Sequence, residues 1–197
     1  MTEITKPDAD LLFNQAHTHT AWLDKPVDDS LLKKAYDLAK MAPTSANCQP
    51  MRIVFVKSKA AKERLKPLLD KGNVDKTMAA PVTAIIAYDM KFYEFLPEFF
   101  PHSPGMKDYF AKNEELAKTT AFRNGSLQGA YFIIAARAMG LDCGPMSGFN
   151  NDGVDKEFFS GTSYKSNFLI NLGYGDASKL FPRGPRPEFS RFCQVLS

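Results

Sequence analysis

Apolar residues recur at helical spacing in two well-defined parts of this 197-residue chain. Within residues 30–41, leucines and alanines repeat three and four positions apart, which predicts a helix with one buried face. Asp28 or Asp29 is the expected N-cap of this helix, and Pro43 ends it. A longer helix is expected over residues 114–139, where glycines and alanines allow the close approach of a partner helix. The pattern therefore predicts a layer of packed helices.

Three shorter helices are expected where a polar residue precedes an apolar run. The expected N-caps are Asp8, Ser58 and either Asp152 or Asp155. The basic amphipathic helix that follows Ser58 is expected to extend through Leu69. Residues 142–145 contain a Gly-Pro pair, which we interpret as the break after the long helix.

Short β-branched stretches predict three strands, at residues 52–58, 82–88 and 167–175. The second is apolar throughout, which is typical of a central strand. Strands separated by helices in this way indicate an α+β fold in which one layer of sheet packs against helices. Because the chain contains no internal repeat or linker-like stretch, we expect residues 1–197 to form a single domain.

Composition narrows the possible partners. The net charge is only +3 and is dispersed along the chain, so no nucleic-acid partner is expected. The longest apolar run, residues 130–136, is too short to span a membrane. Three cysteines without a C-x-x-C pair, and no secretory signal at the N-terminus, favour a reducing compartment, the cytoplasm. Phosphate-loop, Rossmann and nucleophile-elbow motifs are not found in the sequence.

Four stretches carry more polar chemistry than their local structure needs. They are the loop Pro43 to Asn47, the turn with Asn73 and Lys76, the stretch Cys143 to Phe149, and the proline-rich tail with Arg183 and Arg186. Each has a plain alternative: a loop that satisfies its own backbone, a surface turn, or solvated arginines. Two arginines on a stiff segment nevertheless suit a phosphate, which they bind by charge-assisted hydrogen bonds.

A fifth polar stretch contains His17, Thr18, His19 and Thr20. On a strand the two histidines would point the same way, as metal ligands do, but no acidic or cysteine cluster completes a metal site, and none is expected. Hydroxyl and imidazole donors suit a phosphate better. Cys48 has no activating neighbour in the sequence and is not expected to be a nucleophile.

Taken in order, five motifs resemble the FMN-dependent nitroreductase family, and most closely its branch of malonic semialdehyde reductases in pyrimidine breakdown. These motifs are WLDKPV at 22–27, AKMAPTSANCQP at 39–50, GNVDKTMAAP at 72–81, PMSGF at 145–149 and LFPRGPRP at 180–187. The resemblance covers nearly the whole chain. It implies a nitroreductase-like α+β fold with a mostly antiparallel central sheet flanked by helices, in an intertwined homodimer with two sites at the dimer interface.

The resemblance also implies FMN as cofactor, NADPH or NADH as hydride donor, and no nucleophilic catalytic residue. By this resemblance, the flavin in the partner's site is contacted by Pro43, Thr44, Ser45 and Asn47. The phosphate or ribityl chain is contacted by His17, Thr18 and Thr20, and the phosphate by Arg183 and Arg186. The pyrimidine edge faces Asn73 and Lys76, and N5 lies near the backbone of Pro145, Met146, Ser147 and Gly148.

Two departures from the family pattern bear on the function. The stretch 17–20 replaces an Arg-x-Ser-x-Arg pattern, and Ser147 stands where many nitroreductases carry glutamate. The resemblance to the malonic semialdehyde reductase branch favours the reduction of malonic semialdehyde to 3-hydroxypropanoate as the reaction. General reduction of nitroaromatics or quinones and non-catalytic flavin binding are the alternatives. The aromatic stretch 89–113 is interpreted as a lid over the flavin or as a satellite hydrophobic cluster.

Overall fold

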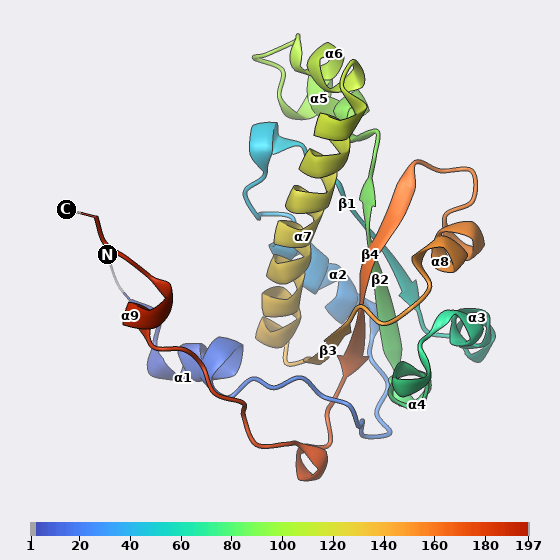
Figure 1. Ribbon diagram of the computed structural model, residues 1–197. Coiled ribbons are helices and arrows are strands. Elements are labelled where there is room, and N and C mark those ends of the chain that lie inside the picture. The colour runs from blue at the N-terminus through green and yellow to red at the C-terminus, as the bar shows by residue number, and fades with distance from the viewer. Residues whose placement is uncertain (1–2, 197) are drawn as a thin grey trace.

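The computed structural model describes residues 3–196 and contains a four-stranded sheet that lies beside one long helix (Figure 1). The strand order is β1 (Met51–Val56), β2 (Val82–Asp89), β4 (Tyr164–Gly173) and β3 (Asp142–Met146). Every neighbouring pair in this order is antiparallel. The predicted α+β class with a mostly antiparallel sheet is therefore confirmed.

The three predicted strands are present, with their ends shifted by a few residues. Nearly every residue of β2 is buried, as expected for a central strand. The strand β3 was missed, because residues 142–145 were interpreted as a break. Its pairing is tertiary: Cys143 lies opposite Leu172 and Pro145 opposite Ile170 of β4. Proline is tolerated there because β3 is the last strand of the sheet.

The long helix α7 (Glu114–Ala138) packs on one face of the sheet together with α2 (Asp29–Ala39) (Figure 1). The predicted partner helix for α7 is α2, and alanines of both helices share one hydrophobic cluster. The two glycines have a different role. A Cβ on Gly125 would lie 2.9 Å from the Cβ of Tyr88, and one on Gly129 would lie 2.5 Å from the Phe168 ring. These glycines let α7 approach the sheet, which corrects the helix–helix interpretation.

Two of the predicted helix caps are confirmed. The Asp28 carboxylate accepts from the backbone N–H of Ser30 at the start of α2. The Ser58 hydroxyl accepts from the backbone N–H of Ala61 in α3 (Lys59–Leu65), which ends before Leu69 because Pro67 follows within a 3₁₀ turn.

The other two caps were placed wrongly. Thr5, rather than Asp8, caps α1 (Lys6–Ala9), which continues as a π-helical turn over Asp10–Asn14. Asn150, rather than an aspartate, caps α8 (Asn151–Phe158). Asparagine and threonine cap helices as well as aspartate does, so the local pattern did not distinguish them. The remaining helices are α4 (Val74–Ala79), α5 (Leu96–Phe99), α6 (Met106–Ala111) and α9 (Phe189–Phe192).

Both ends of the described chain project away from the sheet on the same side of the view in Figure 1, and Arg183 of the C-terminal arm bonds to the N-terminal segment. The C-terminal arm, residues 180–196, is largely exposed and carries uncovered apolar side chains. Among the helices that the structure describes, none has both the length and the apolarity to cross a membrane.

Candidate functional site

A polar hollow of about 510 Å³ lies between the N-terminal segment and the C-terminal arm. Its polar lining residues are His17, Thr18, Thr20, Arg137, Arg183 and Arg186. The structure thus brings together five predicted phosphate ligands and adds Arg137 from the last turn of α7. Arg137 was not predicted from the sequence. The available signal was an isolated arginine after the apolar run of the long helix.

The N-terminal wall of this hollow is attached to the sheet by backbone contacts. His19 N–H donates to the carbonyl of Cys143 in β3 at 3.0 Å, and Thr18 forms a parallel bridge to the same residue. Gly144 makes the approach possible, because a Cβ at this position would lie 2.5 Å from the His19 carbonyl oxygen. Residues 17–20 therefore behave as a short extension of the sheet beyond β3.

The two tail arginines have different contacts. The Arg183 guanidinium donates to the carbonyls of Asn14 and Ala16, at 2.8 and 2.7 Å, and so ties the tail to the N-terminal segment. Arg186 donates only to the neighbouring carbonyls of Gly184 and Pro185. Arg183 thus has a structural role, whereas the contacts of Arg186 are confined to its own loop.

A second predicted group gathers at the end of β3. The side-chain amide of Asn73 donates to the Gly148 carbonyl at 2.7 Å. A Cβ on Gly148 would lie 2.5 Å from that amide nitrogen, so the contact requires glycine. Lys76 lies on α4, and its carbonyl accepts from the indole N–H of Trp22 at 3.0 Å, next to residues 17–20. The hollow, β3 and α4 thus form one continuous region.

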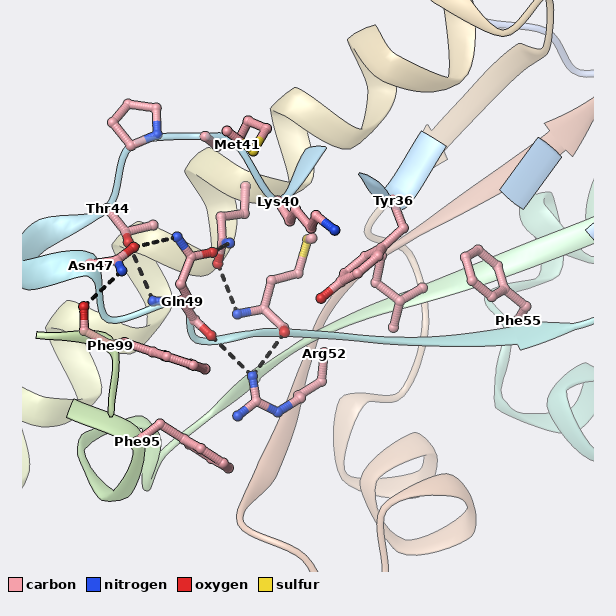
Figure 2. A pocket seen from close by; sticks show the side chains of 15 residues that line it. Tyr36, Lys40, Met41, Thr44, Asn47, Gln49, Arg52, Phe55, Phe95 and Phe99 are labelled. Atoms are coloured by element: carbon pink, nitrogen blue, oxygen red, sulfur yellow. Dashed lines mark hydrogen bonds between the residues drawn. The ribbon is translucent and has the colours of Figure 1, made fainter. Parts of the chain in front are cut away.

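The third group, the loop from Pro43 to Asn47, lies elsewhere. Ser45 N–H donates to the Asn124 side chain on α7 at 2.8 Å. The Thr44 hydroxyl accepts from the backbone N–H of Gln49, and the Asn47 amide donates to the Phe99 carbonyl at 2.9 Å (Figure 2). Several polar groups of this loop therefore stabilise the conformation of the loop itself, in which Asn47 and Gln49 have positive φ angles.

This loop borders a hollow of about 840 Å³ whose aromatic walls include Tyr36, Phe55, Phe95 and Phe99 (Figure 2). The rings of Phe95 and Phe99 stack with centroids 5.8 Å apart. The Arg52 guanidinium also lines this hollow, but it forms an ion pair with the buried Asp89 carboxylate at 2.7 Å.

The satellite cluster predicted for the aromatic stretch 89–113 is present in part of it, and the lid over the flavin stays a prediction. Phe92 and Phe110 are buried in a separate hydrophobic cluster with Cys48, which is the satellite core. Phe95 and Phe99 lie on the other side of the stretch and form a wall of the larger hollow. The same short segment therefore both packs the end of α7 and lines a cavity.

The loop lies beside the middle of α7, where the Asn124 side chain binds it, whereas the polar hollow includes Arg137 from the last turn of this helix. Arg137 also donates to the Leu12 carbonyl. Thirteen residues separate Asn124 and Arg137 along the helix, so the distance is about 20 Å at 1.5 Å per residue. Within one chain, the Pro-Thr-Ser-x-Asn loop and the other predicted contacts do not meet.

His19 and the buried cysteines, Cys48 and Cys143, are placed for structural roles. His19 packs against Gly175, and its Nε2 lies 3.3 Å from the Asp142 carboxylate, while His17 lines the polar hollow. The part of the chain that is described has no cluster of three or more potential metal ligands. Burial raises the pKa of both Cys48 and Cys143 to about 12, so these thiols stay protonated at neutral pH.

Comparison with known proteins gives the family. The model of the nitroreductase family matches residues 15–174, which include the 17–20 segment, the loop, α4 and β3. The chain belongs to the nitroreductase family. This nitroreductase-family chain is therefore an oxidoreductase, and the resemblance inferred from its five motifs is confirmed at the level of the family.

Two curated relatives are similar over nearly the full length of both chains. A protein of Burkholderia lata is 58% identical over 195 residues, which cover 99% of this chain and 100% of the relative. A protein of Cupriavidus pinatubonensis is 55% identical over 188 residues, 94% of this chain and 96% of the relative. Both are named as candidate NADH dehydrogenases/NAD(P)H nitroreductases.

A solved structure supports the fold assignment. A candidate nitroreductase of Exiguobacterium sibiricum, in complex with FMN, superposes with a TM-score of 0.81 at 17% identity and covers 100% of both chains. At this identity the likeness establishes the nitroreductase fold of the present chain.

Proposed function

We propose that this chain is an FMN-dependent NAD(P)H oxidoreductase that reduces aromatic acceptors such as nitroaromatics or quinones. The observation that carries the proposal is the 58% identity, over nearly the whole chain, to a relative named as a candidate NAD(P)H nitroreductase. The FMN in the solved structure of the same fold supports the choice of cofactor.

The donor groups of the described residues fit FMN. The polar hollow offers the hydroxyls of Thr18 and Thr20 and three arginine side chains, all of which are donors that suit a phosphate. At the other end of the same region, the side-chain amide of Asn73 fills the space beside Gly148 and donates to its carbonyl. Arg183, Arg186 and Arg137 would hold the phosphate, and Asn73, Lys76 and residues 145–148 would hold the ring.

When bound, FMN supplies a hydride acceptor and donor at N5. The Lys76 ammonium would stabilise the negative charge that reduction places near N1 and C2=O. The backbone of residues 145–148 would orient the ring edge at N5, and the aromatic walls of the larger hollow would exclude water from the bound acceptor. Hydride transfer between donor, flavin and acceptor does not require a nucleophilic side chain.

A homodimer is part of the proposal. The Pro43–Asn47 loop lies about 20 Å along α7 from the phosphate hollow, so it contacts the same flavin only if a second copy supplies it. Helix α7 also carries exposed apolar side chains that a partner would cover: Phe122 is 51% exposed, Leu127 48% and Tyr131 46%. The projecting terminal arms suit an intertwined assembly.

The larger hollow supports an aromatic acceptor over a three-carbon aldehyde. Its volume of about 840 Å³ and its aromatic walls suit a planar ring. The carboxylate of malonic semialdehyde would need a cation, but the two cations of the lining, Arg52 and Lys40, are already paired with Asp89 and Asp37. The resemblance carried by the five motifs, and Ser147 in place of glutamate, favour malonic semialdehyde, so this acceptor is included in the test.

The test begins with the purified protein. We expect a yellow dimer that releases FMN, oxidises NADH or NADPH, and turns over with a simple nitroaromatic and a quinone. Its kcat/KM for the nitroaromatic should exceed that for malonic semialdehyde by tenfold or more, about 1.4 kcal/mol in transition-state binding. A higher kcat/KM for the aldehyde would replace the substrate proposal. Stable FMN binding without NAD(P)H oxidation would indicate a flavin-binding protein instead of an enzyme.

Arg186→Ala is expected to weaken FMN binding by about tenfold to a hundredfold and to change riboflavin binding little. A hydrogen bond to a charged group contributes about 1.5–3 kcal/mol, and riboflavin has no phosphate. Because Arg186 bonds only to its own loop, a loss of affinity reports the ligand and not the fold. Titration of the apoprotein with both flavins measures the effect.

Arg191→Ala is the matched control for this variant, since Arg191 is an exposed arginine of the same arm outside the polar hollow. Equal losses of FMN and riboflavin affinity in Arg186→Ala would contradict the phosphate assignment.

Leu127→Glu is expected to weaken the dimer at least about thirtyfold. Losing the burial of one leucine costs about 2 kcal/mol, and an unpaired carboxylate in the interface costs more. Ala60→Glu is the control, because Ala60 is an exposed residue of α3, which lies across the sheet from α7 (Figure 1). Light scattering over a dilution series measures the mass. A Leu127→Glu protein that stays dimeric like the control would place the interface elsewhere.

A further inference from the structure

Lys62 is a buried lysine that belongs to none of the predicted site groups. It lies on α3, is only 3% exposed, and donates from Nζ to the Thr77 carbonyl at 2.7 Å and to the Thr83 hydroxyl at 2.8 Å. Within residues 3–196 no carboxylate forms an ion pair with it. A buried ammonium without a counter-ion is costly, and surface lysines serve solubility equally well. Its presence under α4 therefore calls for a functional explanation.

The contacts of Lys62 continue as a connected network. The Thr83 hydroxyl donates to the Asn171 side-chain oxygen at 2.7 Å, and the Asn171 amide donates to the Thr77 hydroxyl at 3.2 Å and to the Lys76 carbonyl at 3.3 Å. The Trp22 indole donates to the same carbonyl. Groups from α3, β4 and the N-terminal segment thus converge on two consecutive residues of α4, Lys76 and Thr77.

Helix α4 depends on such external contacts. It has six residues, Val74–Ala79, and a helix of this length does not stabilise itself in water. The carbonyls near its C-terminal end have no partners within the helix, and the network supplies donors to two of them. The Thr77 hydroxyl also lies 3.5 Å from the sulfur of Met146, at the end of β3. The network therefore connects two residues of the proposed flavin site, Lys76 and Met146.

We propose that Lys62 is a positioning residue for Lys76: with Thr83 and Asn171 it fixes the α4 backbone from which Lys76 stabilises the reduced flavin. The inference rests on the proposed function, in which Lys76 faces the edge of FMN that becomes negative on reduction. A simple packing role for Lys62 would affect the stability of the fold but not the relative affinity for reduced and oxidised FMN.

The experiment measures the midpoint potential of bound FMN in the holoprotein. Lys62→Met and Thr83→Val each break the network, and Thr83→Val does so with little change in side-chain shape. Lys66→Met is the control, since Lys66 is the exposed residue that directly follows α3. We expect both network variants to lose about threefold to tenfold of the preference for reduced FMN, a fall of about 15–30 mV, and the control to match the wild type.

A double-mutant cycle with Lys76→Met tests the route of the effect. If Lys62 acts by positioning Lys76, Lys62→Met changes the potential little further once Lys76 is gone. Fully additive shifts in the midpoint potential would overturn the positioning role. So would an unchanged potential in both Lys62→Met and Thr83→Val when Lys76→Met alone lowers it. If Lys62→Met does not fold, Thr83→Val alone decides. A wild-type protein that does not bind FMN would overturn the proposed function, and this inference with it. A protein that binds FMN but gives one of the contrary potentials above would overturn this inference alone.

Discussion

Gly144→Ala is expected to lower the free energy of unfolding by about 3 kcal/mol and to weaken FMN binding at the same time. The new Cβ would lie 2.5 Å from the His19 carbonyl oxygen and 3.3 Å from the Trp22 ring. Overpacking of this kind costs about 1–3 kcal/mol, and a lost backbone hydrogen bond costs about 1 kcal/mol more. The carbonyl oxygen is part of the backbone, so it moves only if residues 17–20 move away from β3.

The effect on FMN follows from the position of that segment. His17 and Thr18 line the polar hollow, and the contact between His19 and Cys143 attaches them to the sheet. A displaced segment no longer presents these donors to a phosphate. Denaturant unfolding and FMN titration measure the two effects together.

Gly105→Ala is the control for Gly144→Ala, because a Cβ at Gly105 meets nothing within 4 Å. We expect it to change stability by about 0.5 kcal/mol or less. A Gly144→Ala protein with wild-type stability and wild-type FMN affinity would show that residues 17–20 do not need their close contact with β3.

Lys62 is expected to make the stability of the protein rise with pH above about 8. Burial lowers the pKa of the Lys62 ammonium from 10.5 to about 8. Between these two values the unfolded chain still binds the proton that the folded chain has lost. Because the unfolded state binds more protons, the free energy of unfolding increases with pH across this range. The gain between pH 7 and pH 10.5 is about 3 kcal/mol.

The surroundings of Lys62 support this direction of the shift. The groups that it contacts are neutral: the Thr77 carbonyl from α4 and the Thr83 hydroxyl from β2. Asn171, from β4, continues the network and is also neutral. Nothing in these contacts favours the charged form as a carboxylate would.

Urea unfolding of the wild type and of Lys62→Met, from pH 7 to pH 10.5, isolates this contribution. Tyrosines and other lysines titrate in both proteins, so the difference between the two stability curves reports Lys62. As pH rises, the free energy of unfolding of the wild type should increase by about 3 kcal/mol relative to that of Lys62→Met. Lys66→Met should follow the wild type at every pH. Parallel curves for the wild type and Lys62→Met would mean that Lys62 keeps an ordinary pKa in the folded protein.

The sequence by itself determined the elements that depend on local patterns. Strands near 52–58, 82–88 and 167–175 follow from short β-branched runs, and the helix over 114–139 follows from its length and spacing. The caps at Asp28 and Ser58 are equally local. The ordered motifs identified the nitroreductase family, because the polar residues of a binding loop recur at fixed spacing whatever packs around them.

Only the tertiary structure decided which of these residues meet. Gly144 and Pro145 carry no strand signal, and β3 exists because β4 and residues 17–19 pair with it. Arg137 reaches the polar hollow because the end of α7 lies beside the N-terminal segment. The helix after Ser58 was predicted only as basic and amphipathic, and the contacts that bury Lys62 come from α4 and the sheet. In each case the deciding contact joins residues far apart in the chain, and a local pattern does not encode such contacts.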